Sequence, residues 1–355
     1  MANAETADSY KAWHPAATQH SLDECITHWL ASERLEQFQE AQPEITATVF
    51  ALCENAIKRA WGEERDAASL YTIQKTLFSI YQTALAEPLS NESRNQFNPA
   101  ILRIKTLIEQ NWLRFEAQRN LPLPDMTTAD IFNQQLKTLW SEHRSAAHPL
   151  YDYLANQATI NQLRYFFKSD SALNLVFFDL IAMAMIGSRQ EVRGELSRNM
   201  WDESGMGSDS HTHTTLYRDL LERNAIEAAS DDYAHLLTWQ GLAGYNLFLL
   251  SGLNRQHYYK LIGALAMTEL LDPSQYEKLV FAGKRLGLTD RDLHYYAEHI
   301  SVDVVHADGW LNNVILPLVK KTPEAMREIW LGANLRLNTV NDYYDHLLAR
   351  LKTLA

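Results

Sequence analysis

Hydrophobic residues recur at helical spacing along almost the whole chain. In residues 290–315, for example, Leu293, Tyr296, Ile300 and Val304 follow one another at intervals of three or four, which is the period of an amphipathic helix. No alternating pattern with Asn-Gly turns, typical of β-hairpins, competes with it. The sequence therefore predicts an all-α fold. The expected helices cover residues 21–40, 43–61, 67–86, 96–118, 129–143, 150–167, 171–186, 189–201, 213–223, 230–238, 241–251, 254–271, 274–286, 290–315 and 322–350.

Helix-breaking residues are few and mark one main division. The 355 residues include only 13 Gly and 10 Pro, so long uninterrupted helices are expected. Residues 118–130 contain prolines at 122 and 124 between polar flanks, which is typical of a linker. We therefore predict an N-terminal helical region, 1–128, and a larger helical bundle, 129–355. The first region can cover the bundle, form a homodimer contact or cap a pocket, and the sequence does not choose among these roles.

Composition and charge exclude several classes of function. The chain is 46% hydrophobic and 21% charged, as is usual for soluble globular proteins. Its net charge of −12 argues against a nucleic-acid partner and provides no basic face for anionic lipids. No apolar run is long enough for a transmembrane helix, and the N-terminus does not resemble a signal peptide. We therefore expect a cytoplasmic protein with a small-molecule ligand.

The segment His299-Ile-Ser-Val-Asp303-Val-Val-His306 suggests chemistry. On a helix, these three side chains fall within a sector of roughly 60° along about 10 Å of axis. Two imidazoles and a carboxylate on one stripe can face a single metal ion. Thr289 and Asp292 form a capping-box pattern that places the triplet in mid-helix, where unpaired ionisable groups are costly. The competing interpretation is two packed or exposed histidines, one of them paired with the aspartate.

Other stretches contain further candidate ligands. Glu269 lies in a helix that is apolar almost all round, so it needs a partner or a metal unless it faces water near Pro273. Glu203, His211 and His213 cluster around a glycine-rich turn, which is either part of a metal site or a solvated loop.

Two aspartates, Asp170 and Asp179, flank an apolar helix that begins near Ser169. Asp170 is either a ligand or a residue near the helix start that is favoured by the helix dipole.

These residues resemble a known family. Residues from about 148 to 320 are similar to the haem-oxygenase-like diiron oxidases, also called iron-containing redox enzymes. The similar stretches are HPLYDYLANQATINQLRYFFKSD, RNMWDESGMGSDSHTHTTLY, GALAMTELLDP and YAEHISVDVVHADGWLNNVILP. The resemblance implies a haem-oxygenase-like helical bundle, with an additional N-terminal helical region that it does not cover.

The resemblance also implies a ligand set. His213 fits the family's histidine better than His211, because Thr-Thr-Leu-Tyr follows it. Asp170 stands where the family usually has a glutamate and is one methylene shorter, so Asp179 is a substitute. The implied metal ligands are Asp170, Glu203, His213, Glu269, His299, Asp303 and His306.

Members of this family hold two iron ions and use O₂. The resemblance therefore implies a non-haem diiron oxygenase or oxidase that acts on a small amine- or amino-acid-like substrate in secondary metabolism. The reactions it implies are N-oxygenation, desaturation and oxidative C–C cleavage. Electrons must come from an external reductase or reductant, because the chain has no G-x-G-x-x-G motif after a strand and no cysteine set for an iron–sulfur cluster.

Residues for substrate contact are less well marked. Trp310 lies four residues beyond His306 and shares the ligand face, and Tyr245, Tyr259 and Arg198 are further candidates. Each of the four has an alternative interpretation as core packing or as part of a surface ion pair.

Three rival functions remain. A metal-free hydrolase of the same architecture would use a core cysteine as nucleophile, but Cys25 and Cys53, the only two cysteines, lie outside the similar region. A haem-degrading enzyme would have no use for clustered carboxylates. A non-catalytic helical interaction protein would leave the acids and histidines solvated.

Overall fold

Helices make up most of the described residues, which contain no strand. The computed structural model describes residues 20–122, 124, 128–229 and 231–354. The chain divides into two compact units, 1–118 and 119–355. Residues 123 and 125–127 of the predicted linker lie outside the described residues, and the predicted boundary at 128 stays a prediction. Among the described helices, none has an apolar stretch long enough to cross a lipid bilayer.

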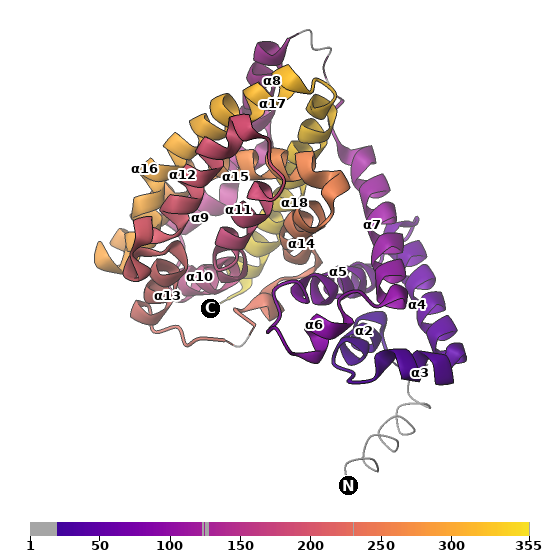
Figure 1. Ribbon diagram of the computed structural model, residues 1–355. Helices are drawn as coiled ribbons and strands as arrows, with labels where there is room; N and C mark the ends of the chain where they lie inside the picture. Colours follow the sequence, from indigo (N-terminus) through magenta and orange to yellow (C-terminus); the bar gives the residue numbers. More distant parts are fainter. Residues whose placement is uncertain (1–19, 123, 125–127, 230, 355) are drawn as a thin grey trace. The chain divides into compact units, whose positions relative to one another are not determined.

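The first unit is a small helical bundle with its own core. Its helices are α2 (Leu22–Leu30), α3 (Leu35–Ala41), α4 (Pro43–Trp61), α5 (Ala67–Gln82), α6 (Asn91–Asn95) and α7 (Pro99–Arg119) (Figure 1). The α5 helix packs against α2 and α4. Trp29 and Trp112, two of its largest apolar side chains, are buried.

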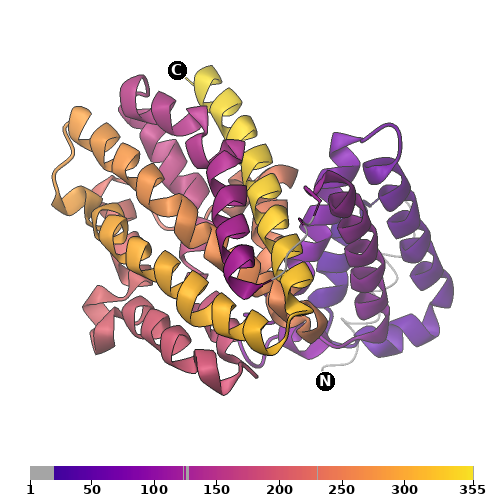
Figure 2. The ribbon, with the colours of Figure 1, turned by 90° about the horizontal axis from the view of Figure 1, so that it is seen from above.

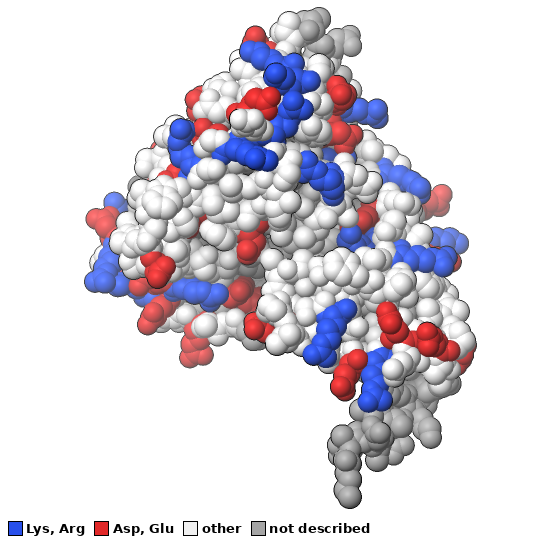
Figure 3. Space-filling view, in the orientation of Figure 1, with Lys and Arg blue, Asp and Glu red and all other residues white. Residues whose placement is uncertain are grey.

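The second unit is a larger bundle. Its helices are α8 (Ala129–Glu142), α9 (Pro149–Asn156), α10 (Ile160–Asn174), α11 (Phe177–Met185), α12 (Arg193–Glu203), α13 (His213–Arg223), α14 (Trp239–Leu253), α15 (Tyr258–Arg285), α16 (His294–Gly309), α17 (Leu316–Lys321) and α18 (Ala325–Thr353). The α15 helix packs against α16, α18 and α9, and α18 also runs beside α8 (Figures 1 and 2). Acidic and basic side chains are interspersed on the face in Figure 3.

Glycines let α15 and α18 cross at very short range. A Cβ added at Gly332 would run into the backbone carbonyl of Lys260, and one at Gly263 into that of Ile329. The two backbones can approach this closely only because neither position has a side chain. This crossing brings polar residues one or two turns further along each helix, Thr268 and Arg336, into contact.

The helix predicted for 150–167 is wrong, and this changes the position of Asp170. The segment contains two helices, α9 and α10, and the second runs through Asn174. Thr159 and Gln162 start it with a capping box, in which the Thr159 amide donates to Gln162 Oε1 at 2.9 Å. Asp170 therefore lies inside α10, not at a helix start, and the dipole explanation for its position does not apply.

Two predicted helix ends, at 271 before Pro273 and at 315 before Pro317, are also wrong. Helices were predicted to break at Pro273, but α15 continues through it to Arg285. Pro273 has no N–H to donate to the carbonyl of Glu269 four residues earlier, so the helix lacks one internal bond beside a candidate ligand. At Pro317 the backbone also stays helical, because a π-helical turn, Trp310–Ile315, leads directly into α17.

Candidate metal centre

Six of the seven predicted ligands form two buried groups inside the second unit. Glu203 comes from the end of α12, His213 from the start of α13 and Glu269 from α15, while α16 supplies three more. The first group is Glu203, His213 and His299, and the second is Glu269, Asp303 and His306. Within each group, one donor atom from each residue lies within 4.8 Å of the others, and all six residues are buried.

A tight turn joins the ends of the two helices that carry Glu203 and His213. Gly205 has a φ of +65°, and a Cβ there would collide with the backbone of His211. Thr212 then starts α13, because its Oγ1 accepts from the Thr215 amide at 3.1 Å. This turn brings Glu203 and His213 side by side, with Glu203 Oε2 3.0 Å from His213 Nδ1.

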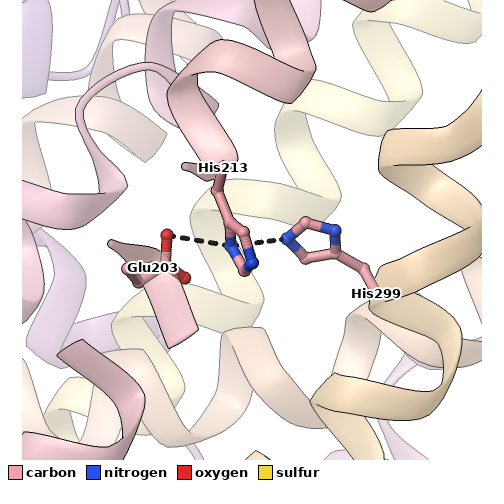
Figure 4. Close-up of side chains that lie close together, drawn as sticks. All are labelled: Glu203, His213 and His299. Carbon is pink, nitrogen blue, oxygen red and sulfur yellow. Dashed lines mark hydrogen bonds and ion pairs between the residues drawn. The ribbon is translucent and has the colours of Figure 1, made fainter. Parts of the chain in front are cut away.

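His299 completes the first group from the opposite side (Figure 4). Its Nε2 lies 3.0 Å from His213 Nδ1. Donor atoms bound at right angles to one metal ion, each at about 2.1 Å, lie about 3.0 Å apart. The spacing of these atoms therefore suits an ion between them.

The second group lies one and two turns further along α16. His306 Nδ1 is 3.5 Å from Glu269 Oε2 and 4.0 Å from Asp303 Oδ1. Asp303 Oδ2 is buried and has no hydrogen-bond partner among the described residues. A buried carboxylate oxygen without a partner is costly, so a cation at this position would satisfy it.

The outer nitrogens of two histidines are held by protein oxygens. His299 Nδ1 lies 2.6 Å from the Tyr295 carbonyl oxygen and donates to it, so Nε2 faces the first group. His306 Nε2 lies 2.9 Å from Asp202 Oδ2, so Nδ1 faces Glu269. Such partners orient metal-binding histidines and fix their tautomers.

The electrostatics of the second group also fit a cation. Burial raises the pKa of Asp303 well above its usual value, and the negative charges of Glu269 and Asp272 raise it further. Burial alone would lower the pKa of His306, but Glu269 and Asp202 outweigh it and raise the pKa to about 9. Crowded carboxylates with imidazoles form a donor set of intermediate hardness, which suits Fe(II).

Comparison with known proteins identifies the family. Residues 164–340 match the family described as iron-containing redox enzyme, and this range contains all seven predicted ligands. The chain belongs to the iron-containing redox enzymes. The family predicted from the sequence motifs is therefore confirmed, and with it the assignment to the oxidoreductases.

Two individual proteins are also similar. The chain is 26% identical over 239 residues to 4-chloro-allylglycine synthase from Streptantibioticus cattleyicolor, covering 64% of this chain and 86% of that protein. A crystal structure of a CADD-like protein of unknown function from Nostoc punctiforme matches with a TM-score of 0.46 and 18% identity. That match covers 62% of this chain and 97% of the other.

The structure separates the alternatives that the sequence left open in this iron-containing redox enzyme. His211 is exposed, and its Nδ1 contacts the hydroxyls of Ser208 and Ser210 at 3.0 Å. His213, two residues later, joins the first group.

The seventh predicted ligand, Asp170, lines a small cavity together with two residues of each group but joins neither group. Its Oδ2 accepts from Tyr296 Oη at 2.9 Å and from Asn174 Nδ2 at 2.8 Å. Burial raises the pKa of Asp170 to about 6 against the lowering effect of these bonds. Asp179 is not among the residues that line this cavity.

Sequence reasoning missed two charged residues of this cavity. Asp272 lies one turn beyond Glu269 on α15, and Arg336 comes from α18. The spacing of Asp272 from Glu269 was a signal available in the sequence, since residues three apart share a helix face. Arg336 offered no such signal, because it lies far in sequence from every predicted ligand.

Of the four predicted substrate contacts, only Tyr245 lines a cavity beside the candidate centre. Trp310 is fully buried, and its Nε1 donates to Asn199 Oδ1 at 2.9 Å. Arg198 pairs with Glu195 at 2.8 Å, and Tyr259 contacts the ring of Tyr258. Neither of the two cavities described here is lined by Trp310, Arg198 or Tyr259.

Proposed function

We propose that this protein is a non-haem diiron oxygenase or oxidase that uses O₂ to oxidise a small amine- or amino-acid-like substrate. The observation that carries the proposal is the pair of buried three-residue donor groups. Two such groups side by side, with carboxylates between imidazoles, are the arrangement that holds two irons in a helical bundle.

Each group would hold one ion. His213 and His299 would supply nitrogen ligands to the first ion and His306 to the second, while Glu203, Glu269 and Asp303 would chelate or bridge. Bound iron would supply the redox chemistry by which O₂ is reduced and the substrate oxidised. The chain's own part is to exclude bulk water, because all six residues are buried, and to fix the imidazoles through Tyr295 and Asp202.

Electrons for the reaction would come from an external reductase or reductant. Cys25 and Cys53 are the only cysteines of the chain, too few for an iron–sulfur cluster. Both are buried in the first unit, outside the family match. The name of one relative, an allylglycine synthase, supports an amino-acid-like substrate and a role in secondary metabolism. N-oxygenation, desaturation and oxidative C–C cleavage are the reactions we consider.

Anaerobic reconstitution with Fe(II) tests the proposal. We expect about two irons per wild-type chain and about one in either His213→Ala or His306→Ala, because each variant removes a ligand from one group. O₂ consumption with a chemical reductant should fall to the background rate in both. His211→Ala is the matched control, since it removes a histidine from the same turn but outside the groups, and it should keep both irons.

Two results would contradict the proposal. One is a wild-type protein that retains no iron after desalting, and the other is equal iron content in His211→Ala and His213→Ala. Either result would mean that the two groups are a buried polar cluster and not a metal centre.

A further inference from the structure

Arg336 stands where two cavities meet. It is 5% exposed and lies on α18. One cavity is lined by Glu203, Glu269, His299 and Asp303 of the two donor groups. The other extends toward Gly241, Gly244 and Tyr245 on α14. The two cavities share the lining residues Asp170, Leu173, Arg336 and Tyr344. A group bound at Arg336 can therefore lie in the second cavity and still be next to the metal ligands.

The guanidinium of Arg336 has few partners in the protein. Its Nε donates to Thr268 Oγ1 at 3.0 Å, and its Cζ lies 5.2 Å from the centre of the Phe248 ring. Among the described residues, the guanidinium makes no other hydrogen bond and no ion pair. Guanidinium has five N–H donors in a planar fork, so most of them lack an acceptor. A buried cation in this condition is costly unless a ligand supplies an anion.

The neighbouring aspartates do not pair with the Arg336 guanidinium. Asp170 and Asp272 line the cavity with Arg336, but neither carboxylate is within ion-pair distance of it. The free edge of the guanidinium therefore remains available to a ligand that enters the cavity.

We infer that Arg336 binds the carboxylate of the substrate, so that the substrate is a compact amino acid and not a simple amine. This inference rests on the proposed function, whose substrate class it narrows. The planar fork of arginine matches a carboxylate through two parallel hydrogen bonds. A carboxylate held at Arg336 would direct the rest of the molecule toward the candidate metal ligands.

Charge balance agrees with this substrate class. The first cavity is lined by the carboxylates Asp170, Glu203, Glu269, Asp272 and Asp303. Two divalent ions and Arg336 together would balance these five charges, so a zwitterionic amino acid enters without leaving net charge buried. An amine cation alone would add an unbalanced charge and leave Arg336 without an acceptor.

The second cavity limits the size of the ligand, and a larger side chain in its wall can block ligand binding. The two cavities have volumes of about 40 and 50 Å³, so only a compact ligand fits. A Cβ added at Gly244 has no neighbour within 4 Å, so a larger side chain there would occupy the second cavity without a backbone clash. Gly244→Leu should therefore exclude the ligand and keep the fold.

The experiment measures ligand binding without turnover. Full-length protein, both metal-free and loaded with Mn(II), is titrated by calorimetry with L-amino acids and with the primary amine that lacks the carboxylate of each. We expect saturable binding of at least one amino acid and at least about tenfold weaker binding of its amine. Arg336→Met and Gly244→Leu should each lose at least about tenfold in affinity, and Arg336→Lys should lose less than Arg336→Met. Arg350→Met, an exposed position on the same helix, should bind like the wild type.

Two outcomes would overturn the inference. One is binding that is the same for an amino acid and its amine and unchanged in Arg336→Met. The other is the absence of any amino-acid binding below about 10 mM. Circular dichroism of each variant separates loss of binding from loss of fold. The binding experiment does not measure O₂ consumption, so its result is independent of the test of the proposed function. Arg336-dependent binding in a protein that shows no iron-dependent O₂ consumption would refute the oxygenase and not the carboxylate site at Arg336.

Discussion

At the scale of single residues, the hydrogen-bond partners of the two ring nitrogens decide whether a buried histidine can bind a metal. His299 and His306 each use one nitrogen to hold a protein oxygen and present the other to a carboxylate or imidazole. His148 uses both nitrogens for structure. Its Nδ1 accepts from the Leu150 amide at 3.1 Å and so caps α9, while Nε2 lies 3.2 Å from Asp345 Oδ1. Only the neutral tautomer with the proton on Nε2 satisfies both contacts.

The capping role of His148 predicts loss of stability in acid. Burial lowers the pKa of His148 below its usual value, although Asp345 opposes this effect. The unfolded chain takes up a proton near pH 6.5, whereas the folded protein resists it. The unfolded state therefore binds more protons, and stability falls as the pH decreases through this range.

Thermal unfolding of the metal-free protein at about pH 7.5 and about pH 5.5 measures this effect. The midpoint of the wild type should fall more between the two pH values than that of His148→Gln, which keeps a donor and an acceptor but does not titrate. His211→Gln, at an exposed histidine, should behave like the wild type. An equal fall of the unfolding midpoint in His148→Gln and the wild type would show that His148 does not cause the loss of stability in acid.

At the scale of elements, the crossing of α15 and α18 positions both the candidate centre and Arg336. Glu269 and Asp272 face the cavity from α15, and Arg336 faces it from α18. Because Gly263 and Gly332 have no side chains, the two backbones meet directly. A small displacement of one helix against the other would therefore change every distance across the cavity.

Gly332→Ala should destabilise the bundle strongly. The added Cβ would run into the Lys260 carbonyl, a backbone atom that cannot turn away, so the helices must separate. Overpacking of this kind costs at least about 2 kcal/mol, which lowers the unfolding midpoint by roughly 5 °C. Gly194→Ala is the control, since a Cβ there meets nothing within 4 Å and alanine favours the helix. A midpoint that is equal in both variants would show that the crossing is not as tight as described.

At the scale of the whole molecule, the sequence predicted features that a single helix determines and missed those that depend on how helices pack. His299, Asp303 and His306 were predictable because a helix alone sets their spacing, and the structure groups them with residues of α12, α13 and α15. The start of α10 was missed although Thr159 and Gln162 carry a local signal for it. Arg336 could not be predicted, because its position depends on where α18 crosses α15, some seventy residues away in the sequence.

The two-unit organisation leads to a prediction about metal removal. All six residues of the two groups lie in the second unit, where burial and mutual repulsion raise the pKa of Asp303 and Asp272. Divalent ions that bind only the folded bundle stabilise it, by about 2.7 kcal/mol when free metal is a hundredfold above its Kd. For a unit of this size the unfolding midpoint should rise by roughly 5–10 °C.

Scanning calorimetry with and without Mn(II) measures the shift, and the double variant His213→Ala/His306→Ala is the matched control. Only the transition of the second unit should move, and only in the wild type, because the first unit contributes none of the six residues. A shift of the same size in the double variant would mean that the metal binds elsewhere. No shift in the wild type would mean that the buried acids are stabilised as protonated carboxyl groups, and the two donor groups would then be a polar core and not a metal centre.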